Sequence, residues 1–168
     1  MHGKSRRRAL SEFGTQLLEK QKIKFTYGLT ERQLQKYFNE AKQKKGITGD
    51  LLLGALEKRL DNAIYRSGLA ASRVVARQLV NHGHFLVNNK KVNIPSYSVK
   101  TGNIIAIKPK SRSKAMFFDL VNKLKKYEAP TWLAVNKKDL DITVKAEPQN
   151  NDLPKNFNMN VVISYYSK

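Results

Sequence analysis

The hydrophobic period of this chain changes from helical to strand-like near Gly83, and that change limits the folds the chain can adopt. Before this point apolar residues recur every three or four positions, as they do in helices that bury one face. After it, short apolar runs at 84–87, 92–94 and 104–107 stand between turn residues, as strands do. Helices followed by strands, without regular alternation, predict an α+β fold.

Local start and stop signals place four helices in the first half. The first is expected from about Ser11 to Phe25 and the second after Thr30, where Gln33 completes a capping box, to near Gly46. A third should begin after 48–50 and run to about Ser67. Its apolar stripe is Leu53, Leu56, Leu60, Ala63 and Ile64. The fourth is capped by Ser72 and closed by Gly83, with Val75, Leu79 and Val80 facing inward.

The second half predicts a small sheet and one more helix. Asn88-Asn89 tolerates positive φ and indicates a tight hairpin between 84–87 and 92–94. Further strands are expected at 104–107, at 140–144 and at 161–165. A helix opening at Ser113 should present Phe117, Leu120, Val121 and Leu124 on one face, and 147–160 reads as a loop.

The net charge restricts the class of partner. The chain of 168 residues carries +19, and the excess of Lys and Arg is spread along its whole length. A small domain needs a net charge of only about 2–8 to stay soluble, so a polyanionic partner is indicated. A large folded RNA, which can surround a protein, fits this distribution better than a flat acidic membrane. With no cysteine, disulfides, thiolate catalysis and Cys-ligated zinc are excluded.

Two predicted helices display Arg and Asn opposite their apolar stripes. Arg59, Asn62 and Arg66 share a face by spacing, as do Arg73 and Arg77 with Asn81 one turn on. Pairing with Glu57 and Asp61 is the alternative, but two carboxylates look too few to neutralise the set. We therefore expect these guanidinium groups to contact phosphate.

Other candidate sites are weak. Gly3-Lys4-Ser5 lacks the remaining glycine and the strand of a phosphate-binding loop. His82 and His84 lack a third metal ligand, and Asp139 and Asp141 lack an acid–base partner. We expect no enzyme activity, no cofactor and no metal.

The residues also resemble a known family. The module resembled is the RNA-binding module named after the fourth small-subunit ribosomal protein, and the matching segment is LEKRLDNAIYRSGLAASRVVARQLVNHGHFLVNNKKVNIPSY (56–97). The flanks resemble the bacterial ribosomal protein family itself, in SRRRALSEFGTQLLEKQK (5–22), YGLTERQLQKYF (27–38), PTWL (130–133) and VVISYYSK (161–168). Two departures stand out: the family usually has a few dozen more residues before the basic arm, and Asn89 often corresponds to Gly.

The resemblance implies a helical domain packed around a module of two short helices on a small antiparallel sheet. The expected divisions are a basic arm (1–10), a helical domain (11–55, with parts of 109–168), the RNA-binding module (56–108) and a segment (109–168) returning to both. We expect RNA contact from Lys4, Arg6, Arg7, Arg8, Lys20, Lys22, Lys24, Lys58, Arg59, Asn62, Arg66, Ser72, Arg73, Arg77, Gln78, Asn81, His82, Lys90 and Lys91.

The family also implies partners and a place in the cell. They are small-subunit ribosomal RNA at a multi-helix junction, where binding nucleates assembly, and the fifth small-subunit protein, through which decoding accuracy is affected. Messenger RNA where it enters the subunit is a further candidate partner. We expect no membrane or DNA partner, and a cytoplasmic or organellar ribosome. The acidic Asp139, Asp141 and Asp152 are expected to face a neighbouring protein, with plain solvation as the alternative.

Three other functions compete with this interpretation. A modifying enzyme such as a pseudouridine synthase needs a separate catalytic domain, for which 109–168 is too short and Lys-rich. A rescue factor that carries the module would lack the matching flanks. DNA binding through the helix pair is disfavoured only by the match to an RNA module.

Overall fold

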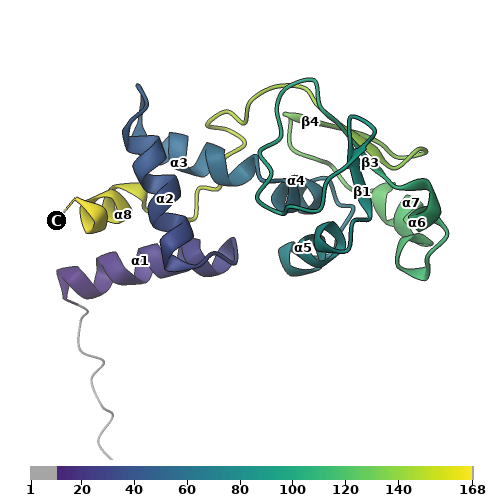
Figure 1. Cartoon of the computed structure of the whole chain (residues 1–168). Coiled ribbons are helices and arrows are strands. Elements are labelled where there is room, and N and C mark those ends of the chain that lie inside the picture. Colours follow the sequence, from purple (N-terminus) through teal and green to yellow (C-terminus); the bar gives the residue numbers. More distant parts are fainter. Residues whose placement is uncertain (1–10, 168) are drawn as a thin grey trace, which may run out of the picture.

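The computed structural model describes residues 11–167, which form two lobes side by side (Figure 1). The helical lobe contains α1 (Glu12–Thr26), α2 (Glu31–Lys42), α3 (Thr48–Glu57) and α8 (Met159–Tyr166). The sheet lobe contains α4 (Leu60–Arg66), α5 (Arg73–Asn81), the strands and three short helical pieces. Each lobe has its own core of buried apolar side chains. The α+β prediction is confirmed.

The predicted helix starts are confirmed where a side chain caps the helix. Ser11 accepts a hydrogen bond from the Gly14 N–H, and Ser72 accepts one from the Val75 N–H. Thr30 and Gln33 form the complete capping box of α2. These caps satisfy backbone N–H groups that have no partner inside the helix. On α5, Leu79 and Val80 are buried as expected, but Val75, expected to face inward, is exposed.

The single helix expected from 48–50 to Ser67 is wrong, because it breaks at Lys58-Arg59 into α3 and α4. Arg59 has extended backbone, with φ −65° and ψ 140°. A neighbouring segment takes the backbone groups: the Leu60 N–H donates to the Tyr97 carbonyl and the Val99 N–H to the Lys58 carbonyl. The predicted stripe is thereby divided, with Leu53 and Leu56 in the helical-lobe core and Leu60, Ala63 and Ile64 in the sheet-lobe core.

The sheet is antiparallel throughout, in the order β2-β1-β3-β5-β4. Its strands are β1 (Phe85–Val87), β2 (Lys90–Lys91), β3 (Ile104–Ile107), β4 (Leu133–Asn136) and β5 (Asp141–Val144). Asn88 and Asn89 have φ of 48° and 62°, so the predicted hairpin is confirmed. Its second strand is 90–91 rather than 92–94, because a two-residue turn pairs Val87 directly with Lys90.

The helix expected to open at Ser113 is wrong. The segment forms three short pieces, α6 (Pro109–Arg112), η1 (Ala115–Phe117) and α7 (Leu120–Leu124). Lys114 is extended, which lets Phe117 turn inward and meet the rings of His84 and Phe85 edge-on. Leu120 and Leu124 are buried as expected, but Val121, expected on the same face, is exposed.

The strand expected at 161–165 is also wrong, since these residues lie in α8. A short run of Val, Ile and Tyr suits either period, so its neighbours decide the structure. Asn158 caps the helix, Val162 is fully buried, and the Tyr166 ring stacks on Phe38 with centroids 4.7 Å apart. α8 packs against α1 and α3, far from the sheet (Figure 1).

Candidate nucleic-acid interface

The junction between the lobes contains a network of ion pairs built on two buried carboxylates. Glu57 ends α3 and is fully buried, and Asp61 lies in the first turn of α4 and is 2% exposed. The interruption of the helix at Lys58-Arg59 places both acids between α4, α5 and the end of α1. We call this set the Glu57–Asp61 network. Its members are Tyr27, Glu57, Arg59, Asp61, Asn62, Arg66, Arg73 and Arg77.

Glu57 accepts hydrogen bonds from three side chains. Tyr27 donates its hydroxyl at 2.6 Å, Asn62 donates its amide at 3.0 Å, and Arg66 donates from Nε and Nη2 at 2.8 and 3.1 Å. Burial raises the pKa of Tyr27 far above its usual value, and the charge of Glu57 raises it further. The phenol therefore remains a donor to the carboxylate.

Asp61 joins Arg59, in the break between α3 and α4, to Arg77 of α5. Arg59 donates from Nε and Nη2 at 3.0 and 2.8 Å, and Arg77 donates from the same two atoms at 3.0 and 2.8 Å. Burial opposes the charge on Arg59, but the hydrogen bonds and charge of Asp61 raise the pKa of Arg59 above its usual value. Two acids thus hold four arginines, because one carboxylate accepts from several donors.

Arg77 connects the two lobes. Besides Asp61, it donates from Nη2 to the Tyr27 carbonyl at 2.6 Å and from Nη1 to the Gly28 carbonyl. These carbonyls end α1 in the helical lobe, whereas Arg77 belongs to α5 of the sheet lobe. A guanidinium has five N–H groups, so most of its donors are engaged. Arg77 therefore has few N–H groups available for a phosphate unless it releases Asp61 or the carbonyls at the end of α1.

Arg73 is held mainly by rings. Its guanidinium carbon lies 4.8 Å from the Tyr27 ring centroid and 4.5 Å from that of Tyr65, and its Nε donates to the Asn62 side chain at 2.7 Å. Sequence reasoning missed both tyrosines and the capacity of Glu57 and Asp61. The signal was present, since these acids lie four residues apart beside the arginines that they bind.

The predicted RNA-contact residues therefore separate by position. Lys20, Arg59 and Asn62 are buried, which corrects the expectation that they lie on open helix faces. Lys24, Lys58, Arg66, Ser72, Arg73 and Arg77 are partly exposed. The exposed members are Lys22, Gln78, Asn81, His82, Lys90 and Lys91. Lys4, Arg6, Arg7 and Arg8 lie outside the described residues.

The lysines of α1 are engaged with the helical lobe. Lys20 is 3% exposed, donates to Glu31 at 2.7 Å and lies over the Tyr165 ring at 4.6 Å. Burial of Glu31 opposes its charge, but its hydrogen bonds with Lys20 and Tyr166 lower the pKa of Glu31. Lys20 of α1 therefore contacts Glu31 of α2 and Tyr165 of α8. Because its side chain is buried in these contacts, its ammonium group is not exposed to an RNA.

The exposed members other than Lys22, which lies on α1, gather at the end of α5 and the tip of the hairpin. Gln78, Asn81 and His82 end the helix, and Lys91 lies across Gly83, where an added Cβ would clash with its side chain. Because Gly83 has φ of 70°, the chain turns sharply from α5 into β1 and brings the hairpin alongside. This surface is basic and carries exposed polar side chains, the residue types that hydrogen-bond to nucleic acid in general.

The three predicted protein-contact acids do not form one patch. Asp139 lies in the turn between β4 and β5, where it accepts from Asn136 at 2.7 Å, and Asp141 begins β5. Asp152 lies near the other end of that hairpin and accepts from the N–H and hydroxyl of Thr131 at 3.1 and 2.7 Å. Asp152 therefore organises a loop.

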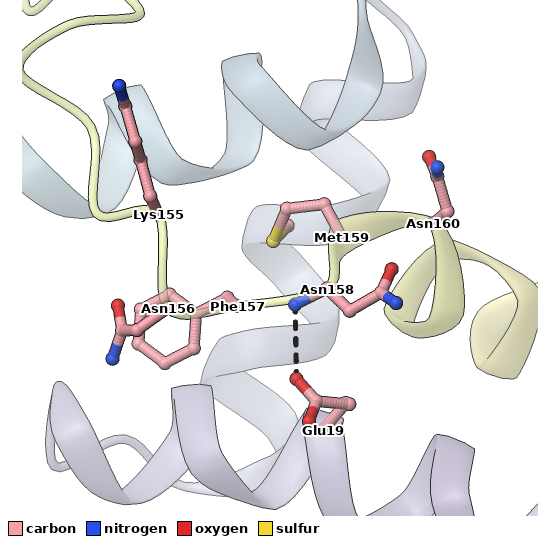
Figure 2. Close-up of a pocket in the computed structure, with 7 residues that line it drawn as sticks. All are labelled: Glu19, Lys155, Asn156, Phe157, Asn158, Met159 and Asn160. Carbon is pink, nitrogen blue, oxygen red and sulfur yellow. Dashed lines mark hydrogen bonds between the residues drawn. The ribbon is translucent and has the colours of Figure 1, made fainter.

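A pocket beside α1 has no catalytic arrangement. Figure 2 shows Glu19 below the segment 155–160, with the Asn158 N–H donating to its carboxylate at 3.1 Å. Burial opposes the charge on Glu19, but Lys22 and this N–H lower the pKa of Glu19, so the acid is engaged in structure. Among residues 11–167 no three His, Asp or Glu side chains gather as metal ligands. Over the same residues, no helix is both long and apolar enough to cross a bilayer.

Known proteins match this chain along nearly its whole length. Residues 58–105 match the profile of the S4 domain, and residues 1–57 match that of the ribosomal protein S4/S9 N-terminal domain. The small ribosomal subunit protein uS4 of Chloroflexus aurantiacus is 49% identical over 170 residues, covering 99% of this chain and 82% of the relative. The same protein of Borrelia hermsii is 44% identical over 169 residues, covering 100% and 81%. That of Roseiflexus castenholzii is 47% identical, covering 99% and 82%.

Proposed function

The chain belongs to the uS4 family of small ribosomal subunit proteins, and from this we propose that it is a structural constituent of that subunit and binds its ribosomal RNA directly. The family is structural and non-enzymatic, so the prediction against an enzyme is confirmed. The observation that carries the proposal is the S4 domain match over 58–105, within a chain of net charge +19.

The residues of the interface support two roles. The exposed Gln78, Asn81, His82, Lys90 and Lys91 contact the RNA, together with the outer edges of Arg66 and Arg73. The Glu57–Asp61 network holds α4, α5 and the end of α1 in fixed positions. RNA recognised by shape needs such rigid placement, because the contacts must match a preformed junction.

Finer parts of the proposal rest on the family resemblance. The site is a multi-helix junction, binding there nucleates assembly of the subunit, and a contact with the fifth small-subunit protein affects decoding accuracy. Messenger RNA near its point of entrance is a further partner, and the location is a cytoplasmic or organellar ribosome. Asp139 and Asp141 support the protein contact, since they are carboxylates at the surface of a basic chain.

The test of the function is sedimentation of cell lysate through a sucrose gradient. The chain is expected with small subunits after a high-salt wash, and the purified chain is expected to bind small-subunit ribosomal RNA more tightly than an unstructured strand of equal length. Recovery only at the top of the gradient, with equal affinity for both RNAs, would contradict the proposal.

The protein contact has its own test. Reversing the charge of Asp139 and Asp141 should leave affinity for bare ribosomal RNA unchanged or slightly higher, and should loosen docking of the fifth protein in reconstituted subunits. Reversing the charge of the exposed Glu128 is the control. Normal occupancy and a normal decoding error rate in the aspartate variant would remove this role.

A further inference from the structure

A pocket of about 360 Å³ opens beside α5, on the opposite side from the Glu57–Asp61 network. Its floor is buried and apolar, and includes Leu69, Leu79 and Leu120. Val75 of α5, which is 39% exposed, and Met116 of η1, which is 53% exposed, also line it. A pocket with this apolar lining suits an uncharged ring better than a charged group.

The rim of the pocket carries polar side chains. Gln78 and His82 line it and are exposed, and among residues 11–167 no hydrogen bond from either side chain to another residue is found. Lys123 also lines the pocket and pairs loosely with Asp119, at 3.7 Å, both largely exposed. An amide and an imidazole can each donate and accept, as the edge of a nucleobase requires.

The surroundings are cationic. Lys91 lies across Gly83, next to His82, and the charges of Lys114, His82 and Lys108 bear on the neighbouring His84. Burial lowers the pKa of His84, and these charges lower it further. A pocket in such a field attracts a ligand attached to phosphate more strongly than an uncharged peptide.

We propose that this pocket receives one unpaired nucleobase of small-subunit ribosomal RNA, packed against Val75 and Met116 and read at its edge by Gln78 and His82. The inference rests on the proposed function and deepens it by adding an apolar base-binding slot to a basic surface. RNA recognition in general splays unpaired bases out against side chains, and this pocket lies beside the exposed surface already described. An apolar peptide of a neighbouring protein is the competing occupant.

The experiment compares two adjacent valines. Val74 is 77% exposed and lies outside the pocket, whereas Val75 is part of its wall. Val75→Glu and Val74→Glu add the same charge at nearly the same place, so their difference reports the pocket. With full-length small-subunit ribosomal RNA as probe, Val75→Glu should bind about tenfold more weakly than Val74→Glu, a difference of about 1.4 kcal/mol. Gln78→Ala should weaken binding in the same direction, and Asn81→Ala should weaken it less.

A photo-crosslinking side chain at position 75 supplies an independent readout. It should crosslink to a single unpaired nucleotide, whereas the same group at position 74 should not. Equal binding by both Glu variants, with wild-type affinity intact, overturns the pocket and leaves the proposed function standing. Absence of wild-type binding overturns both. Unchanged RNA affinity of Val75→Glu with loss of a neighbouring protein from reconstituted subunits assigns the pocket to a peptide and overturns the nucleobase.

Discussion

At the scale of the residue, the basic side chains of this protein differ in whether their N–H groups are already bound within the protein. Arg77 donates hydrogen bonds to Asp61 and to two carbonyls at the end of α1, so its role is to position the lobes. Lys90 and Lys91 are exposed at the hairpin tip. The spacing of charged residues identified both groups, but only the burial of Glu57 and Asp61 separates them.

Arg77→Lys keeps the charge and removes the planar fork. We expect a loss of about 1.5–3 kcal/mol in the free energy of unfolding, the range for hydrogen bonds to charged groups. Denaturant titration followed by circular dichroism measures it. Arg32→Lys on the exposed face of α2 is the matched control and should change little. Unchanged stability with weakened RNA binding would instead assign Arg77 to direct phosphate contact.

His84 makes stability depend on pH. Its ring is buried, with Nδ1 2.9 Å from the Ser111 hydroxyl, and burial lowers the pKa of His84, helped by Lys114, His82 and Lys108. The unfolded chain takes up the proton first, at about pH 6.5. The contribution of His84 is therefore complete above that pH and is lost as pH falls through the lower pKa of the folded state.

Melting curves between pH 7.5 and 5.5 test this. The melting temperature should fall with pH in the wild type and fall less steeply in His84→Gln. His82→Gln, on the exposed end of α5, removes one of the lesser causes that lower the pKa of His84 and should change the slope only slightly. The same slope in all three proteins would show that His84 is not the group responsible.

At the scale of the element, the sequence predicts the structures whose signals are local. The caps Ser11, Thr30 and Ser72 and the positive-φ pair Asn88-Asn89 each satisfy their requirement within a few residues. The break between α3 and α4 could not be predicted this way, because hydrogen bonds from 95–99 compete for its backbone. The helix at 159–166 was missed because a distant part of the chain decides its structure too. Its apolar side chains pack against α1 and α3.

Val162→Ala tests the packing of α8. Val162 is fully buried against the helical lobe, so its truncation should cost about 1–3 kcal/mol of unfolding free energy, from lost burial and a residual cavity. Val161→Ala, at a partly exposed position, should cost clearly less. Thermal unfolding of both variants is the measurement. The reverse order would be expected of a strand that buries 161, 163 and 165, and would contradict the helix.

At the scale of the whole molecule, the protein has two separate apolar cores, with the Glu57–Asp61 network between them. Its net charge of +19 predicts a salt-dependent complex with RNA, because bound cations displace counterions. Affinity for small-subunit ribosomal RNA should fall about a thousandfold or more between 50 and 200 mM salt. Filter binding across that range measures the slope.

The salt dependence of RNA affinity also distinguishes side chains that contact phosphate from side chains that hold the lobes in position. Replacing Lys90 and Lys91 by Ala should flatten the log–log plot by about one unit or more, since each contacted phosphate contributes roughly 0.7–0.9. Arg77→Lys should lower affinity and leave the slope unchanged. A slope near zero in the wild type would contradict binding through phosphates, and a flatter slope in Arg77→Lys would contradict its positioning role.

The place of α8 has a consequence for how the chain is made. Residues 12–57 are synthesised first, yet Val162, Tyr166 and Phe157, which complete their core, follow about a hundred residues later. A nascent chain therefore keeps an apolar groove uncovered until the whole sheet lobe has been translated. Translation that stops early leaves that groove open to chaperones and proteases, so only a finished product closes both cores.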